Sequence, residues 1–224
     1  MERVPEPELM EDHRQARAYA EADFSEPHDR FVALFRECFP GVDLAGPVLD
    51  LGCGPADVSC RFALAHPRCT LHGVDGSAAM LAEGRRLVAA RGLAGRITLH
   101  LLRLPSEGLP AGPFAAVISN SLLHHLADPA VLWRTIAALA APAAPVFVMD
   151  LLRPASEREA RALVAAHASG EPDILQRDFY HSLRAAYRPE ELRGQLAAAG
   201  LDQFTVRVVS DRHLIVYGRL DGAG

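Results

Sequence analysis

The sequence predicts an α/β fold: a doubly wound, mostly parallel sheet of seven strands with helices on both faces and an antiparallel hairpin at its C-terminal end. Short apolar runs alternate with helical patterns from residue 47 to residue 150, and parallel strands need such crossovers. Two later apolar runs are separated by a short polar segment, which favours a hairpin. With 224 residues, half of them apolar, the chain suits one domain with a sizeable core.

The expected strands are short apolar runs bounded by glycine, proline and polar residues. In chain order they are Pro47–Leu51, Thr70–Val74, Arg96–Leu101, Ala115–Ser119, Val146–Asp150, Gln203–Val209 and His213–Arg219. The last two flank Ser210-Asp211-Arg212, which we interpret as a hairpin turn rather than as part of a site.

The expected helices follow periodic apolar residues and start or stop signals. Ser77 can cap one helix, Pro129 fits the first turn of another, and Gly92 and Gly200 follow two helix ends. The helices are Glu8–Ala20, a helix capped by Ser25 that ends at Pro40, Ala56–Ala65, Ser77–Ala90, Pro129–Ala140, Ala155–Ala168 and Pro189–Ala199. Residues 170–181 are expected to form a connector.

The charge balance argues against a nucleic-acid partner. The net charge is −5 and no run of arginines is dense enough to make a basic face. All 23 basic residues are Arg, which excludes lysine bases and Schiff-base lysines and suggests a high-GC bacterial source.

Cysteine usage and the N-terminal residues predict a cytoplasmic protein. The four cysteines form no Cys-x-x-Cys pair and are expected to be reduced thiols. Residues 1–6 lack the apolar region of a signal peptide, and no apolar run approaches the roughly 18 residues that span a membrane.

The strongest local signal is a strand followed by Gly52-x-Gly54 and then a helix. Two glycines after a strand let the backbone approach a ligand closely, although such pairs also make ordinary tight turns. Asp75, at the end of the second strand, can accept both hydroxyls of a ribose; the alternative role of helix cap is already filled by Ser77. Asp57 stands where a dinucleotide-binding motif needs a third glycine, which favours a sulfonium ligand over a pyrophosphate.

Three segments in order resemble the motifs of class I S-adenosylmethionine (SAM)-dependent methyltransferases. Val48–Pro55 resembles the first motif, Gly73–Leu81 the second, and Ile118–Leu126 the segment after the fourth strand in its quinone-biosynthesis-like form. The resemblance covers about residues 46–150. It implies a Rossmann-like sheet and SAM as the cofactor.

The resemblance also implies a set of cofactor contacts. The methionine part of SAM would meet the glycine loop and Asn120, the ribose Asp75, and the adenosine the residues after it. Asp50 would anchor the loop or the SAM amino group. An acid usually follows the third strand in the family; this chain has Arg103 and Leu104, whose backbone would serve instead. The expected cofactor-binding residues are Asp50, Gly52, Cys53, Gly54, Asp75, Gly76, Ser77, Arg103, Leu104, Asn120 and Tyr19.

Tyr19 is included because an N-terminal lid over SAM would place it there; the alternative is a surface helix with one buried aromatic face. Candidate acceptor residues follow the fourth and fifth strands, where open α/β sheets place ligands. His124 is the candidate catalytic base, and His125 lies beside it; the alternative is that they pack inward or cap a helix. Asp150 and Arg153 either face the acceptor or pair with each other, and Tyr180 and His181 either line the pocket or pack as an ordinary loop.

No metal site is expected, because adjacent histidines in a strand point to opposite faces. The predicted protein is a SAM-dependent methyltransferase that transfers a methyl group to a small-molecule acceptor by in-line displacement. The alternatives are a non-catalytic SAM-binding regulator or partner subunit, and a nicotinamide-dependent oxidoreductase. A monomer or homodimer is expected. Residues 46–224 would form the core, residues 1–45 an N-terminal helical lid or extension, and residues 155–190 an acceptor-side cap.

Overall fold

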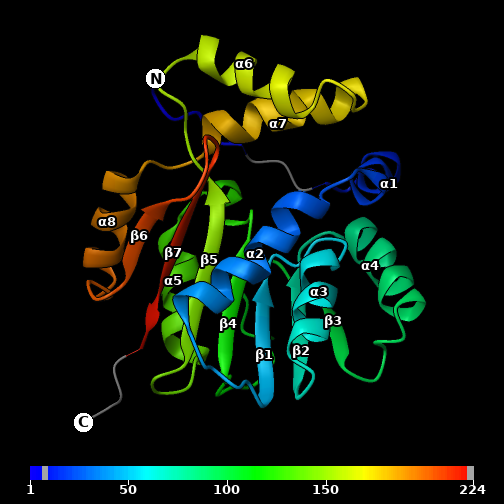
Figure 1. Cartoon of the computed structure of the whole chain (residues 1–224), viewed down its shortest axis with the longest axis vertical. Coiled ribbons are helices and arrows are strands. Elements are labelled where there is room, and N and C mark those ends of the chain that lie inside the picture. The colour runs from blue at the N-terminus through cyan, green and yellow to red at the C-terminus, as the bar shows by residue number, and fades with distance from the viewer. Residues whose placement is uncertain (7–9, 221–224) are drawn as a thin grey trace.

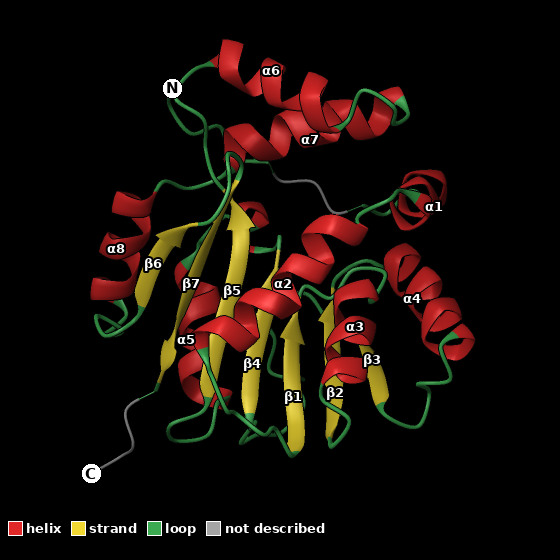
Figure 2. Cartoon of the chain, in the orientation of Figure 1, coloured by secondary structure: helices red, strands yellow, loops and turns green. Residues whose placement is uncertain are grey.

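The computed structural model describes residues 1–6 and 10–220, which form a seven-stranded sheet between two helical layers (Figures 1 and 2). The strand order is β3-β2-β1-β4-β5-β7-β6. The strands are β1 (Gly46–Leu51), β2 (Cys69–Asp75), β3 (Ile97–Leu101), β4 (Ala116–Asn120), β5 (Pro145–Leu151), β6 (Thr205–Val208) and β7 (His213–Arg219). The first five strands run parallel, and β7 is antiparallel to both β5 and β6, which confirms the predicted fold.

The helices cover both faces of this sheet. They are α1 (His13–Glu21), α2 (Ser25–Cys38), α3 (Asp57–Ala65), α4 (Ala78–Ala90), α5 (Ala130–Leu139), α6 (Glu157–His167), α7 (Asp173–Ala185) and α8 (Pro189–Ala198), with a single 3-10 turn, η1 (Leu123–His125). Among the described residues, no helix has both the length and the apolar composition that a membrane crossing requires.

Two apolar cores hold the layers together. On one face, Phe31 and Phe35 of α2 pack edge-on against Phe147 of β5 and, with Phe62 of α3, are fully buried. On the other face, Trp133 of α5 is fully buried among apolar residues of β1, β4, β5 and α8. The sheet is therefore buried on both sides, as a doubly wound parallel sheet requires.

The parallel register brings polar residues to one edge of the sheet. Asp50 is paired with Ile118 near the ends of β1 and β4, and Asn120 is paired with Met149 near the ends of β4 and β5. Helices α6 and α7 lie beyond these carboxyl ends (Figure 1). Ligands bind at this edge in open α/β folds, so the site is expected there.

The expected connector at residues 170–181 is wrong, because most of it belongs to α7. Pro172 stands at the N-cap, where its missing N–H costs nothing, so it starts a helix rather than breaking one. Leu175, Phe179 and Leu183 then recur every four residues, a spacing typical of an amphipathic helix.

Two helix starts also differ from the expectation. The expected start of the first helix at Glu8 lies outside the described residues, and α1 begins at His13 after Asp12, whose carboxylate accepts from the backbone N–H groups of Arg14 and Gln15. Ser25 is the first residue of α2 and not its cap. The first backbone N–H groups of a helix have no partner within the helix, and that of Ser25 is one of them. It donates to the Asp23 carboxylate instead.

Candidate active site

A cavity of about 660 Å³ opens at the carboxyl ends of the parallel strands. This volume lies within the range of small-molecule sites. Its walls come from the loops after β1, β2, β3 and β4, from helices α1, α2 and α7, and from the turn between β6 and β7. The cavity therefore joins the glycine loop to three segments that are distant from it in the sequence.

The glycine loop after β1 is held in a backbone conformation that other residues adopt only with strain. Gly52 has φ 74° and Gly54 has φ 51°. A Cβ on Gly52 would lie 2.6 Å from the Cβ of Leu122, so no side chain fits there. Cys53, between them, is buried, and burial raises the pKa of its thiol. The loop thus exposes backbone rather than side chains to the cavity.

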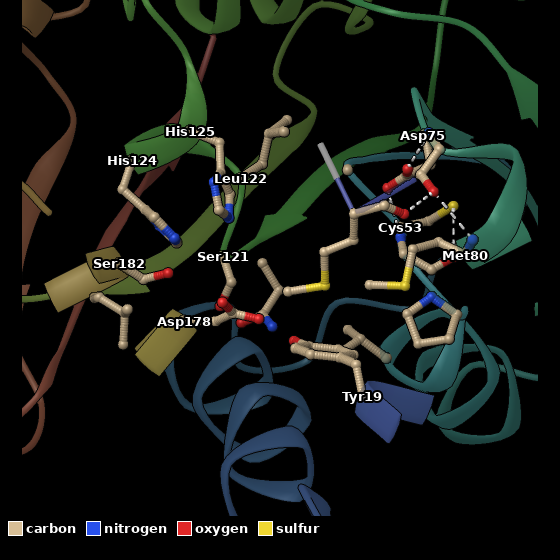
Figure 3. A pocket seen from close by; sticks show the side chains of 18 of the residues that line it. Tyr19, Cys53, Asp75, Met80, Ser121, Leu122, His124, His125, Asp178 and Ser182 are labelled. Carbon is tan, nitrogen blue, oxygen red and sulfur yellow. Dashed lines mark hydrogen bonds between the residues drawn. The ribbon is translucent and has the colours of Figure 1, made fainter. Parts of the chain in front are cut away.

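Asp75 ties the glycine loop to the start of α4. Its carboxylate accepts from the backbone N–H of Gly54 at 2.9 Å and from that of Ser77 at 2.8 Å (Figure 3). Burial raises the pKa of this carboxyl group. The Ser77 hydroxyl caps α4 by accepting from Met80 N–H and donates to the carbonyl of Met10 at 2.5 Å. The N-terminal segment is therefore bonded directly to the cofactor end of the cavity.

Asp50 is a buried acid directly beneath the loop. The Ser59 hydroxyl donates to it, but burial dominates, and together with the nearby charge of Asp75 it raises the pKa of Asp50 to about 7. Placing such a carboxylate in the core lowers stability, and an ammonium group in the cavity would offset that cost.

Asp57, the first residue of α3, lies on the cavity wall and pairs with two basic side chains. Its Oδ2 is 2.8 Å from Nδ1 of His28 and 2.6 Å from Nε of Arg61. Burial raises the pKa of Asp57, but these hydrogen bonds outweigh burial and lower it to about 2. Asp57 therefore fixes α2 against the start of α3.

His124 and Asp150 form a buried pair at the end of the cavity opposite Asp75. Nδ1 of His124 lies 2.6 Å from Oδ1 of Asp150, whose other oxygen accepts from the backbone N–H of Leu123. Burial raises the pKa of Asp150, but the His124 charge and hydrogen bond outweigh it and lower that pKa. The carboxylate thus holds one imidazole nitrogen, while the histidine lines the cavity.

His125 lies beside His124, with ring centroids 4.0 Å apart and the ring planes tilted by 39°. Burial, reinforced by the charge of His124, lowers the pKa of His125 to about 3. The expectation that the two adjacent histidines point to opposite faces of a strand is wrong, because both lie in the 3-10 turn η1. One ligand atom from each lies within 4.8 Å of one from the other and of a carboxylate oxygen of Glu6.

The structure brings together all the residues expected to bind the cofactor, and both histidines with them, around one cavity. Four of the expected acceptor residues do not line it. Asp150 lies behind His124, and Arg153 pairs with Glu191 at 2.7 Å instead of with Asp150. Tyr180 packs between α6 and α7 among arginine side chains, and the His181 ring lies edge-on to it.

Several lining residues had no place among the sequence candidates. Asp178 and Ser182 line the cavity from α7, one helical turn apart. Once 173–185 is recognised as a helix, their spacing of four puts them on one face, opposite Tyr180. Arg212 and His213 also line the cavity, so the segment interpreted as a plain hairpin turn contributes to the site as well.

These features fit SAM. The left-handed glycines leave a cradle that a Cβ at Gly52 would fill. The buried carboxylate of Asp50 and the half-buried one of Asp75 lie beside it, and no cationic side chain of the described residues is bonded to either. A molecule with a ribose, an ammonium group and a sulfonium matches this donor set better than a dinucleotide, whose pyrophosphate would meet carboxylates.

Comparison with known families agrees with this fit. The family described as "Methyltransferase domain" matches residues 48–145, from β1 to the start of β5. The fold and the site together define a SAM-binding α/β domain. The chain carries a class I SAM-dependent methyltransferase domain.

Two curated relatives are similar over part of the chain. A ubiquinone biosynthesis O-methyltransferase from Bordetella pertussis is 29% identical over 165 residues, which cover 71% of this chain and 64% of the relative. A ribosomal RNA small subunit methyltransferase C from Shewanella sp. (strain MR-4) is 34% identical over 104 residues, covering 45% of this chain and 28% of the relative. The chain therefore spans less than two thirds of each.

Solved structures share the fold over nearly the whole chain. A SAM-dependent methyltransferase from Aquifex aeolicus superposes with a TM-score of 0.69 at 16% identity, covering 93% of this chain and 98% of that one. The plantazolicin methyltransferase BpumL, in complex with a monoazolic desmethylPZN analog and S-adenosylhomocysteine (SAH), gives a TM-score of 0.69 at 12% identity, covering 93% of this chain and 90% of that one. At these identities the likeness establishes the fold alone.

Proposed function

We propose that this chain transfers the methyl group of SAM to a small-molecule acceptor that binds beside His124. The observation that carries the proposal is the buried His124–Asp150 pair, at 2.6 Å, in the wall of the cavity that also contains the glycine loop. A base oriented by a carboxylate and a methyl-donor site in one cavity are the two parts that methylation of a protonated acceptor needs.

On the cofactor side, the backbone of Gly52 and Gly54 would hold the methionine part and Asp75 the ribose. Asp50 would offset the ammonium charge, and the backbone after β3 would face the adenine. Bound there, SAM supplies a methyl group activated by its sulfonium. The chain's own contribution is to align the acceptor with that methyl group and to keep water out.

On the acceptor side, Asp150 holds Nδ1 of His124 so that Nε2 is the nitrogen available to a substrate. We assign His124 the role of general base, which takes the acceptor's proton as the nucleophile attacks. Asp150 is a positioning residue, because it acts through His124 and does not line the cavity.

Residues 1–45 and 155–190 would close the cavity as a lid and a cap. Ser77 binds the carbonyl of Met10, Tyr19 lies on the cavity wall, and α7 supplies Asp178 and Ser182 to it. Burial and the charge of Asp75 raise the pKa of Tyr19 to about 12, as expected for a phenol held against the cofactor site. A cavity of about 660 Å³ favours a small acceptor over a nucleic acid.

The test is methyl transfer to an extract of small metabolites, followed as SAH release. His124→Ala is expected to lower the rate by about 100- to 10,000-fold, because a positioned base contributes that much, while SAH affinity stays within twofold. Asp150→Asn should lower the rate less. Unchanged transfer in His124→Ala would contradict the assigned base.

The second candidate is a SAM-binding protein without turnover, since the glycine loop and Asp75 would serve it equally well. It predicts SAH binding with no SAH release from any extract of the native host. The family match favours SAM over a nicotinamide cofactor and therefore disfavours the oxidoreductase alternative.

A further inference from the structure

Asp178 is a buried carboxylate that faces the part of the cavity beside His124, where the acceptor would bind. Its side chain is only 7% exposed, and Figure 3 shows it pointing into the space between Tyr19 and the histidine pair. Ser182, one turn further along α7, faces the same space. These two positions are therefore next to any acceptor that reaches His124.

The described contacts of Asp178 hold it in place but include only one long ion pair, to an exposed arginine. Its Oδ2 accepts from the neutral amide of Gln15 on α1 at 2.6 Å. Its Oδ1 is 3.4 Å from Nη2 of Arg177, a long contact to a side chain that is 59% exposed. An ionised carboxylate has about four acceptor positions, and a buried one requires a cation for compensation.

The other charged groups near this end do not supply that cation. Arg212 lines the cavity, but its guanidinium already contacts Asp211, Glu26 and His167. Arg3 donates to the backbone carbonyls of Ala185 and His124.

Glu6 adds a second buried carboxylate, bonded to Ser182 at 2.8 Å, and Glu171 adds a third acid to the cavity wall. The acceptor end therefore contains three acidic side chains, and Oδ1 of Asp178 lacks a strong donor among the described residues.

We propose that Asp178 selects acceptors that carry a protonated amine, which would donate to its Oδ1 while the acceptor atom lies beside His124. An anionic acceptor beside His124 would face the like charges of Asp178 and Glu171, which disfavours its binding. A neutral hydroxyl could bond to Asp178 but would leave its charge uncompensated. The inference rests on the proposed function, because it names the acceptor class of that same site.

A metal ion is the rival occupant of the neighbouring Glu6–His124–His125 group. Two ligands of one tetrahedral zinc ion, each about 2.1 Å from it, are about 3.4 Å apart. Here Nδ1 of His125 is 3.8 Å from Oε2 of Glu6, and that oxygen already accepts from Ser182. The spacing favours an organic cation at Asp178 over an ion at the histidines.

The test is calorimetric titration of the SAH-loaded, chelator-treated protein with probes of one skeleton and different charge. Phenethylamine, phenethyl alcohol and hydrocinnamate form one set; tyramine, tyrosol and phloretate form the other. The amines are expected to bind at least about tenfold more tightly than the alcohols, and the acids most weakly. Equal affinities, tighter acids or no amine binding would overturn the proposal, and this comparison needs no variant.

Asp178→Asn is expected to bring the amines to the level of the alcohols. The matched control is Asp128→Asn, which removes another cavity carboxylate, one paired with Arg134, and should change nothing. A loss of SAM affinity without loss of SAH affinity in Asp178→Asn would show that Asp178 pairs with the sulfonium and would overturn the proposal. If the chelator-treated wild type binds the amines only after Zn²⁺ is added, the result would favour a metal ion at the histidines and overturn the proposal. Failure of the wild type to bind SAH at all would instead remove the proposed function.

Discussion

The cavity has two halves that are built from different kinds of contact: a cofactor half around Gly52, Gly54 and Asp75, and an acceptor half around His124 and Asp178. In the cofactor half, Asp75 bonds to Gly54, 21 residues away, and to Ser77, two residues away, at the ends of paired strands. In the acceptor half, Gln15 bonds to Asp178 across 163 residues and Glu6 to Ser182 across 176. The cofactor half is thus part of the sheet framework, whereas the acceptor half is assembled by segments that surround it.

This difference predicts how each half responds to mutation. Changes in the cofactor half disturb a backbone that is also part of the core, so binding and stability fall together. Changes in the acceptor half remove side-chain contacts between helices, so substrate choice can change while the fold persists. The same division would let related chains keep one methyl donor and use different acceptors.

Gly52→Ala is the largest stability change expected in the cofactor half. The substitution adds a Cβ at φ 74°, only 2.6 Å from the Cβ of Leu122. We expect the free energy of unfolding to fall by about 2–4 kcal/mol, from backbone strain and overpacking combined, with loss of SAH binding. Urea unfolding and calorimetry measure both.

Gly92→Ala is the matched control for that substitution. Gly92 also has a positive φ, 68°, but nothing lies within 4 Å of the added Cβ. Only strain remains, so about 1 kcal/mol should be lost and SAH binding kept. Equal effects at both positions would show that Leu122 does not restrict the loop.

Asp50→Asn is expected to stabilise the ligand-free protein while weakening SAM binding. Because the pKa of Asp50 is raised to about 7 in the folded state, its ionisation disfavours folding progressively as pH rises from about 4 to 7. Removing the carboxylate should therefore add about 1–3 kcal/mol to the free energy of unfolding at pH 8 and little at pH 4. Unfolding in urea at both values tests the sign; a loss of stability at pH 8 would contradict the burial argument.

Asp57→Asn should show the opposite pH dependence, with a smaller effect. The pKa of Asp57 is lowered to about 2, so its ion pairs stabilise the fold above about pH 4 and are lost as pH falls toward 2. The variant is expected to lose about 1–2 kcal/mol at pH 7, and less as the pH drops below 4. Asp29→Asn, which removes a 69% exposed partner of the same Arg61, is the control and should have almost no effect.

How much the sequence predicts also differs between the halves. Gly52, Asp75 and Asn120 follow strands directly, so strand prediction alone placed them together at one edge of the sheet. Asp178 could not be found in this way, because its role depends on α7 crossing the cavity and on Gln15 reaching it from α1. The sequence offers Tyr180 and His181 as candidates in this segment, but helix geometry turns them away from the cavity and turns Asp178 and Ser182 toward it.

Asp150 and Arg153 give a similar lesson on the fifth strand. Both stand near the end of β5, and a mutual ion pair was a reasonable alternative for them. In the fold, Asp150 pairs with His124 and Arg153 with Glu191 of α8. Neither partner is a neighbour in the sequence, so only the packing of α8 and η1 against β5 determines the pairs.

The most direct test of the central claim is calorimetric titration of wild type and Asp75→Ala with SAH and with NADH. We expect the wild type to bind SAH with micromolar affinity and not to bind NADH. Asp75→Ala should bind SAH at least about 100-fold more weakly, because it removes the carboxylate that accepts from Gly54 N–H and that we propose holds the ribose hydroxyls. Failure of the wild type to bind SAH, or unchanged affinity in Asp75→Ala, would contradict the account.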